Sequence, residues 1–188
     1  MDSSILNINQ SSAELSKIYT EDYYYYLRSQ AFCEAFLQPL GECINDLGFP
    51  CLDVGCGEGQ LAEFVEVPYH GIDGSRVAIE TAKTVLEKPT RTFQVARLEN
   101  YPLETRERFG TIVFGGILSV LIKPEKRVDL LRLYQRLKPE FFIVYDLEIL
   151  ETEQLDEEFK LVEEYHATAN IDLQDVKRHR KILVYQCS

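Results

Sequence analysis

Basic residues are few in this sequence compared with acidic ones. The 188 residues include 20 Lys and Arg against 31 Asp and Glu, so the net charge is −11 and the isoelectric point is near 4.8. Proteins hold nucleic acids mainly through Lys and Arg contacts to phosphates. The charge therefore argues against a nucleic-acid partner and favours a small or basic substrate.

Paired cysteine motifs, a signal peptide and long apolar runs are missing as well. The five cysteines are an odd number without paired Cys-x-x-Cys motifs, which is typical of free thiols in a reducing compartment. The first residues lack the basic start and apolar core of a signal peptide, and no apolar run approaches the length of a membrane span. We therefore expect a cytoplasmic protein without a membrane partner.

The remaining composition is that of an ordinary globular protein, with 45% hydrophobic and 27% charged residues. A chain of this length buries a core without disulfides, and it contains no internal repeat, linker or low-complexity tract. One compact domain is predicted.

Hydrophobic periodicity predicts alternating strands and helices. The predicted strands are residues 51–54, 69–73, 92–96, 111–114, 141–146, 159–165 and 181–186, and the predicted helices are 13–47, 60–66, 75–87, 124–137 and 151–158. Pro39 and Gly41 are expected to bend or split the first helix. In the helix over 75–87, Ser75 is the expected N-cap, and the residues expected to face inward are Val77, Ala78, Ala82 and Val85.

The chain is organised around one glycine-rich stretch, Leu52-Asp53-Val54-Gly55-Cys56-Gly57-Glu58-Gly59. An apolar strand here runs into a turn and then into a helix-like segment. Glycines at three alternate positions let the backbone turn tightly and approach a ligand closely. The pattern predicts a cofactor-binding loop.

Two carboxylates near this loop narrow the choice of cofactor. Asp53 precedes the first glycine and would repel the pyrophosphate of a dinucleotide, so a cationic ligand suits it better. Asp73 ends the next predicted strand, where a carboxylate can accept both hydroxyls of a ribose. A doubly wound domain that binds NAD is the alternative.

Taken together, the glycine stretch and Gly71-Ile72-Asp73 resemble the class I S-adenosylmethionine-dependent methyltransferases. The resemblance covers about residues 51–186 and implies S-adenosylmethionine as cofactor, with S-adenosylhomocysteine as product. It implies an α/β fold: a doubly wound, seven-stranded, mostly parallel sheet with an antiparallel last strand, helices on both faces and an N-terminal helical cap. We expect residues 1–48 to form the cap and residues 49–188 the methyltransferase domain.

The resemblance also implies a set of cofactor-binding residues. Around the loop and the following strand they are Asp53, Gly55, Cys56, Gly57, Gly59, Asp73 and Gly74. Cys56 is interpreted as a small packing residue rather than a nucleophile. Gly115 follows the fourth predicted strand and lets the backbone approach the ligand closely.

The expected adenine contact departs from the family pattern. Arg97 stands where relatives often have an aspartate, although the backbone amide of Leu98 can still contribute and Glu99 is a possible substitute. Gly110 also replaces an acidic residue that is usual before the fourth strand. These departures leave open a protein that binds the cofactor without transferring a methyl group, or a structural subunit.

Four successive tyrosines, residues 23–26, lie in the first predicted helix. They would point to all sides of that helix, so they cannot all be buried in the core. One interpretation is a half-exposed packing helix; the other is a cap over the cofactor, as in similar methyltransferases, with rings against the sulfonium. In the second interpretation Tyr24 and Arg28 contact the cofactor.

Methyl transfer from a sulfonium is an in-line displacement, so positioning can supply much of the catalysis. A hydroxyl acceptor also needs a base. The catalytic candidates are Asp146 and Glu148 at the end of the fifth predicted strand and His166 near the last strands. Their simpler roles are turn capping for the two acids and surface exposure for the histidine. No metal site is predicted.

The preferred function is methyl transfer to oxygen or nitrogen of a small-molecule acceptor. No Asn-Pro-Pro-Tyr signature follows the fourth strand, which removes amino methylation of nucleobases or glutamine. The alternatives are a protein or RNA methyltransferase that acts with a partner, and a catalytically inactive cofactor-binding or structural subunit.

Overall fold

The computed structural model of the protein describes residues 29–97, 101, 108–115, 135–147, 159–170 and 177–187. Several predictions lie outside these residues. They are the tyrosine run at 23–26, the helix at 151–158, most of the helix at 124–137, and the site residues Tyr24, Arg28, Leu98 and Glu148.

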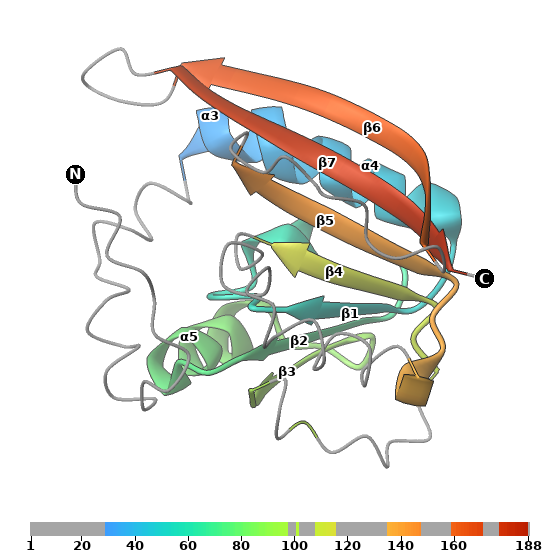
Figure 1. Cartoon of the computed structure of the whole chain (residues 1–188). Coiled ribbons are helices and arrows are strands. Elements are labelled where there is room, and N and C mark those ends of the chain that lie inside the picture. Colours follow the sequence, from blue (N-terminus) through green and yellow to red (C-terminus); the bar gives the residue numbers. More distant parts are fainter. Residues whose placement is uncertain are drawn as a thin grey trace.

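The described chain forms one seven-stranded sheet in the order β3-β2-β1-β4-β5-β7-β6 (Figure 1). The strands are β1 (Cys51–Val54), β2 (Tyr69–Asp73), β3 (Arg91–Val95), β4 (Thr111–Gly115), β5 (Phe141–Leu147), β6 (Phe159–Asn170) and β7 (Lys177–Cys187). The first five strands are parallel, and β7 runs antiparallel to both of its neighbours, β5 and β6. The predicted fold, with its antiparallel last strand, is confirmed.

The last two strands are longer than their apolar patterns predict. β6 continues beyond residue 165 to Asn170, and β7 begins at Lys177 rather than at 181. The two strands pair with each other along this whole length, from Phe159 opposite Cys187 to Asn170 opposite Lys177. Hydrogen bonding within the hairpin thus extends the strands past the apolar segment, since backbone pairing needs no apolar side chain.

The N-terminal helical segment packs on one face of the sheet. It consists of α3 (Gln30–Phe32), the π-helical turn η1 (Cys33–Leu37) and α4 (Gln38–Leu47). Pro39, in the first turn of α4, has no N–H and would clash with the carbonyl four residues earlier. The N–H of Gln38 instead reaches back five residues to the Cys33 carbonyl, which widens the helix here without interrupting it.

The segment after the glycine loop is a short 3₁₀ turn, η2 (Gln60–Glu63), where the sequence predicts a helix over 60–66. Asn45 of α4 explains why the helix ends early. Its Nδ2 donates to the Phe64 carbonyl at 3.0 Å, and its Oδ1 accepts from the Glu66 N–H at 2.8 Å. The first bond satisfies a carbonyl that would lie in the unpaired last turn of a helix over 60–66, and the second satisfies an N–H that such a helix would have paired internally.

Helix α5 (Arg76–Leu86) begins at the predicted N-cap, where Ser75 Oγ accepts from the Ala78 N–H at 3.3 Å. Its buried residues are Ala78, Ile79 and Ala82. The inward positions predicted for Val77 and Val85 are wrong, because these side chains are 58% and 71% exposed. The buried stripe follows positions 78, 79 and 82, and both valines lie outside it.

Two apolar clusters cover the two faces of the sheet. The cluster under α4 and α5 includes Phe36, Ile44, Tyr69, Ile79, Phe93 and Ile143. The opposite cluster includes Leu52, Ile72, Ile112, Phe114, Phe142 and Leu183, with Leu137 from a helical turn at 135–137 packed against it. None of the helices among the described residues is long and apolar enough to cross a membrane.

Candidate cofactor-binding site

The candidate site lies where the parallel strands end. In Figure 1 the arrowheads of β1, β4 and β5 point to the same side of the molecule. Strands β2 and β3 lie on one side of β1, and β4 and β5 lie on the other, so the chain reverses its progress across the sheet between β1 and β4. Open α/β sheets bind ligands at this kind of switch point. The glycine loop follows β1, and Gly115 ends the neighbouring β4.

The glycine loop makes the predicted tight turn. Gly55, Gly57 and Gly59 have φ angles of 83°, 56° and 80°, a region that side chains disfavour. The N–H groups of Gly55 and Cys56 both donate to the Ile72 carbonyl, at 2.8 and 3.1 Å. The loop therefore folds back against the end of β2.

Close packing is a second reason why residue 59 is a glycine. A Cβ there would lie 2.6 Å from the Phe93 ring. By contrast, among the described residues a Cβ on Gly115 would meet the Tyr145 ring at 3.8 Å, an ordinary contact. Packing among these residues thus requires glycine at 59 but not at 115.

Asp73 connects the glycine loop to the start of α5. Its Oδ2 accepts from the Gly57 N–H at 2.9 Å, and its Oδ1 accepts from the Ser75 N–H at 2.7 Å. Burial raises the pKa of Asp73, and the two backbone hydrogen bonds oppose that rise. Each carboxylate oxygen has two acceptor sites, so each keeps one for a further donor. Asp73 can therefore still accept a pair of ribose hydroxyls.

Asp53 lies inside the sheet beside this loop. Only 3% of its surface is exposed, and its Oδ2 accepts a hydrogen bond of 2.5 Å from the Tyr69 hydroxyl. Burial raises the pKa of Asp53 to about 7; the Tyr69 hydrogen bond lowers it, and the nearby charge of Asp73 adds to the rise. A buried carboxylate next to another one favours a cationic ligand, which relieves the repulsion.

Tyr69 is a site residue that the sequence analysis missed. In the parallel register it lies opposite Cys51, two residues before Asp53, so both side chains project from the same face of the sheet. The sequence does not show which residues of β1 and β2 lie opposite each other. The Tyr69 ring at the first residue of β2 can reach a carboxylate on β1 only if the two strands pair in this register.

The remaining loop residues fit packing roles. The Cys56 thiol is 8% exposed, and burial together with the charges of Asp53 and Asp73 raises its pKa well above the usual value. It therefore stays protonated. Glu58, also buried, accepts from the Gln60 side chain at 3.3 Å. Gly74 is partly exposed, between the carboxylate of Asp73 and the start of α5.

Arg97 lies beside Asp73 in the fold. The Ala96 N–H donates to the Asp73 carbonyl at 3.0 Å, so the segment after β3 runs along the end of β2. Arg97 itself is partly buried. The position expected to contact adenine is thus adjacent to the position expected to contact ribose.

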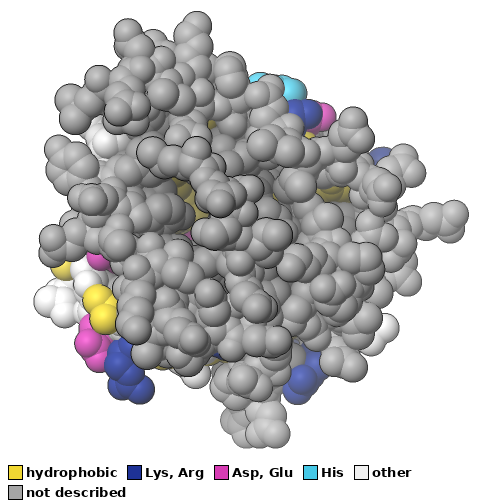
Figure 2. All heavy atoms as spheres, turned by 60° about the vertical axis from the view of Figure 1, so that its left-hand side comes forward, with side chains coloured by type: hydrophobic (Ala, Val, Ile, Leu, Met, Phe, Trp, Pro, Cys, Tyr) yellow, Lys and Arg dark blue, Asp and Glu magenta, His cyan; other side chains and the backbone are white. Residues whose placement is uncertain are grey.

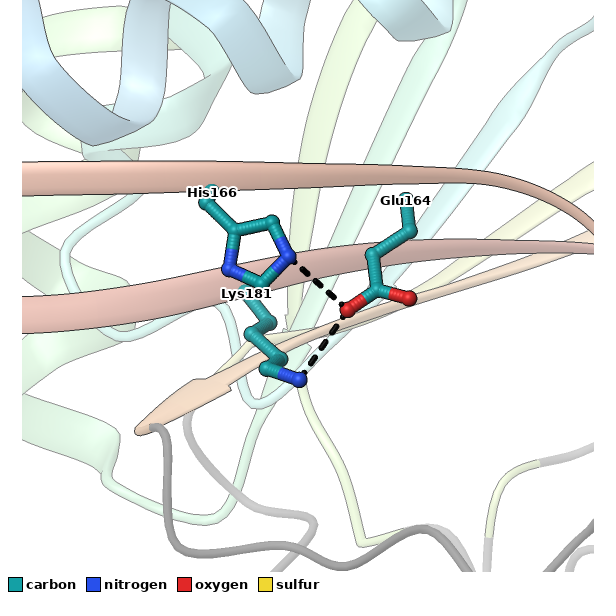
Figure 3. A network of polar contacts seen from close by, with 3 residues as sticks. All are labelled: Glu164, His166 and Lys181. Carbon is teal, nitrogen blue, oxygen red and sulfur yellow. Dashed lines mark hydrogen bonds and ion pairs between the residues drawn. The ribbon is translucent and has the colours of Figure 1, made fainter.

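Two catalytic candidates share one row of the sheet. Asp146 of β5 is opposite Lys181 of β7, which in turn is opposite His166 of β6. His166 is 61% exposed, and its Nε2 lies 3.0 Å from Glu164 Oε1, which also accepts from Lys181 Nζ at 3.0 Å (Figure 3). The Lys181 hydrogen bond lowers the pKa of Glu164, whose side chain is 36% exposed. His166 thus belongs to a surface ion-pair network.

No cluster of three or more potential metal ligands occurs in the described part of the chain. All five cysteines fall within that part, and all are free thiols.

The chain matches one family model and is similar in fold to many solved structures. The profile of the family described as "Methyltransferase domain" matches residues 51–140, from the start of β1 to the residue before β5. A search of curated proteins finds no match to the sequence.

Three solved structures illustrate the similarity in fold. Magnesium protoporphyrin IX methyltransferase from Synechocystis PCC 6803, solved with bound S-adenosylmethionine, is 15% identical with a TM-score of 0.65, and the alignment covers 97% of this chain and 100% of that one. A Haloferax volcanii protein proposed to be a methyltransferase, in complex with the Trm112 activator, is 12% identical with a TM-score of 0.62, and the coverage is 87% and 94%. The Pyrococcus abyssi tRNA (uracil-54, C5)-methyltransferase, in complex with S-adenosylhomocysteine, is 16% identical with a TM-score of 0.59, and the coverage is 83% and 38%.

Proposed function

We propose that this chain, whose residues 51–140 match the family model described as a methyltransferase domain, transfers a methyl group from S-adenosylmethionine to oxygen or nitrogen of a small-molecule acceptor. The family match and the similarity in fold support the enzyme class and the cofactor. The chemical class of the acceptor is the part that we add.

The residues at the strand ends fit the cofactor. S-adenosylmethionine supplies a methyl group on a sulfonium, so the reactive carbon comes with the ligand. Asp73 would hold the ribose hydroxyls with its remaining acceptor sites, and Asp53 would attract the ammonium group of the amino-acid end. Gly115 would let the backbone approach the methyl-transfer zone. The role of the chain is to bind and orient the two reactants.

The observation that carries the small-molecule proposal is the net charge of −11. A polyanionic acceptor would be repelled over distances of about a Debye length, roughly 8 Å at physiological salt. In Figure 2, which brings the left side of Figure 1 forward, the charged side chains of the described residues lie at the edge of the view and carry both signs.

For a hydroxyl acceptor, we propose Asp146 and Glu148 as groups that face the acceptor, with His166 as a further candidate base. The supporting observation is that Asp146 is near the carboxyl end of β5, in one row with Lys181 and His166. We also propose a cytoplasmic location, since all five cysteines are free thiols.

A label-transfer assay tests the acceptor class. Purified protein is incubated with methyl-labelled S-adenosylmethionine and a cell extract, and the products are separated by size and by nuclease and protease digestion. We expect label in material of low molecular mass. Label that nuclease or protease releases from large material would contradict the small-molecule proposal. An Asp73→Ala variant, which lacks the proposed ribose contact, is the negative control.

The alternative is protein or RNA methylation with the help of a partner. It is favoured by the similarity in fold to an activator-bound protein and to a tRNA methyltransferase. The same assay discriminates between the two, because partner-dependent activity appears only in unfractionated extract and labels large molecules.

A further inference from the structure

A buried tyrosine is directed at the carboxylate that the cofactor needs. Tyr69 is the first residue of β2, and its hydroxyl donates to Asp53 Oδ2 on the neighbouring β1 at 2.5 Å. Both side chains are 3% exposed. In the described part of the chain, Tyr69 is the one hydrogen-bond donor to the Asp53 carboxylate.

The other titratable groups around Asp53 do not replace this donor. Asp73, at the end of β2, carries the same sign of charge and raises the pKa of Asp53. Cys51 on β1 and Cys56 in the loop are buried thiols whose pKa values are raised well above the usual range, so they stay neutral. Burial raises the pKa of Tyr69 in the same way, so its hydroxyl keeps its proton and remains a donor.

We propose that Tyr69 is a positioning residue: its hydroxyl holds the Asp53 carboxylate in place, with Oδ1 left for the ammonium group of the cofactor. The proposal rests on the proposed function, because it takes Asp53 as a cofactor contact.

The hydrogen bond also determines when Asp53 is charged. Burial and Asp73 raise the pKa of Asp53 to about 7, and the Tyr69 bond is the contribution that opposes them. Without the hydroxyl, the pKa of Asp53 rises further, and the group is protonated at neutral pH. A neutral acid attracts a cationic ligand far less strongly, so the hydroxyl supports cofactor binding at neutral pH.

Replacement by phenylalanine isolates this effect. The Tyr69 ring packs against Phe93, with ring centroids 5.8 Å apart, and a phenylalanine keeps that contact. The Tyr69→Phe variant therefore removes the hydroxyl while the apolar packing is retained. Tyr185→Phe is the matched control, because Tyr185 is also buried but belongs to the cluster on the opposite face of the sheet.

The experiment is calorimetric titration of both variants and the wild type with S-adenosylhomocysteine, which retains the ammonium group, at several pH values from 5.5 to about 8.5. We expect the wild-type affinity to fall below about pH 7. In Tyr69→Phe the fall should begin at higher pH, with binding about 10-fold weaker at pH 7 and a smaller loss remaining at about pH 8.5, where the Asp53 carboxylate is charged but no longer held by the hydroxyl. Tyr185→Phe should follow the wild type.

A purely structural role would give a different result. If Tyr69→Phe weakens binding equally at every pH, or not at all, Tyr69 is not a positioning residue. If the wild type itself does not bind, the proposed function fails and takes this role of Tyr69 with it. A carboxylate NMR titration without cofactor then tells whether Tyr69 still controls the charge of Asp53.

The test does not depend on one variant folding. If Tyr69→Phe is unfolded, Asp53→Asn removes the titrating group itself. Its weakened binding should then be independent of pH between about 5.5 and 8.5. A pH dependence that persists in Asp53→Asn would overturn the proposal.

Discussion

Asp53 and Asp73 are both buried beside the glycine loop, but their environments differ. Asp73 accepts two backbone hydrogen bonds, which stabilise its charged form. Asp53 accepts one bond from a side chain and has a pKa of about 7. Asp73 therefore connects the loop to the start of α5, whereas Asp53 has a pKa at which its charge changes near neutral pH.

The stability of the protein without ligand should show this difference. The folded state raises the pKa of Asp53 from 3.8 to about 7, so folded protein binds this proton more tightly than unfolded protein. Its contribution to stability is complete below about pH 3.8 and is lost as the pH rises through about 7. Asp53→Asn cannot titrate, so between pH 5 and 8 it should gain roughly 2–3 kcal/mol relative to the wild type.

Urea unfolding at both pH values measures this change in the free energy of unfolding. Asp46→Asn is the control, because Asp46 is exposed on α4 and should show little change relative to the wild type. A constant difference between Asp53→Asn and the wild type at the two pH values would mean that Asp53 has the same pKa in both states.

At the scale of elements, the sequence predicted what depends on apolar burial. β1 and β5 are apolar because the sheet buries them on both faces, so the sequence alone locates them. It did not predict the extended hairpin of β6 and β7, where backbone pairing continues beyond the apolar segment. The early end of η2 was missed for a similar reason, since it depends on the Asn45 side chain from a distant helix.

The sequence likewise predicted some residues of the candidate site and missed another. Asp53, Asp73 and the glycines are recognisable because the motif is contiguous with the strands that carry it. The structure brings these residues together, with Gly57 donating to Asp73. Tyr69 could not be found without the register of two strands that are separated by the crossover.

Two glycines with similar backbone angles allow a test of the loop. Gly48 at the end of α4 and Gly59 in the loop have φ angles of 74° and 80°. Among the described residues, a Cβ at Gly48 meets nothing within 4 Å, whereas one at Gly59 lies 2.6 Å from the Phe93 ring. Gly48→Ala should cost about 1–2 kcal/mol for the left-handed backbone, and Gly59→Ala should cost at least ~1 kcal/mol more.

Urea unfolding of the two variants compares these costs directly. The Gly59 variant should also lose cofactor affinity, while the Gly48 variant keeps it. Equal destabilisation would mean that the loop relaxes away from Phe93, and that the close packing of Gly59 does not hold the loop in place.

At the scale of the whole molecule, the order of the strands determines where the chemistry can occur. The reversal between β1 and β4 places the glycine loop, Asp73 and Gly115 at one edge of the sheet. The hairpin of β6 and β7 extends the sheet on the far side of β5 and carries His166 and Lys181 in a row with Asp146. One edge of the sheet thus carries both the residues proposed to bind the cofactor and the residues proposed to face the acceptor.

The most direct test of this account is calorimetric titration of the purified protein with S-adenosylmethionine, S-adenosylhomocysteine and NAD in parallel. We expect micromolar binding of the first two ligands and no binding of NAD. Asp73→Ala should bind both adenosyl ligands at least ~10-fold more weakly, because two charge-assisted hydrogen bonds are lost. Binding of NAD, or of none of the three, would contradict the assignment of this edge of the sheet as a site for S-adenosylmethionine.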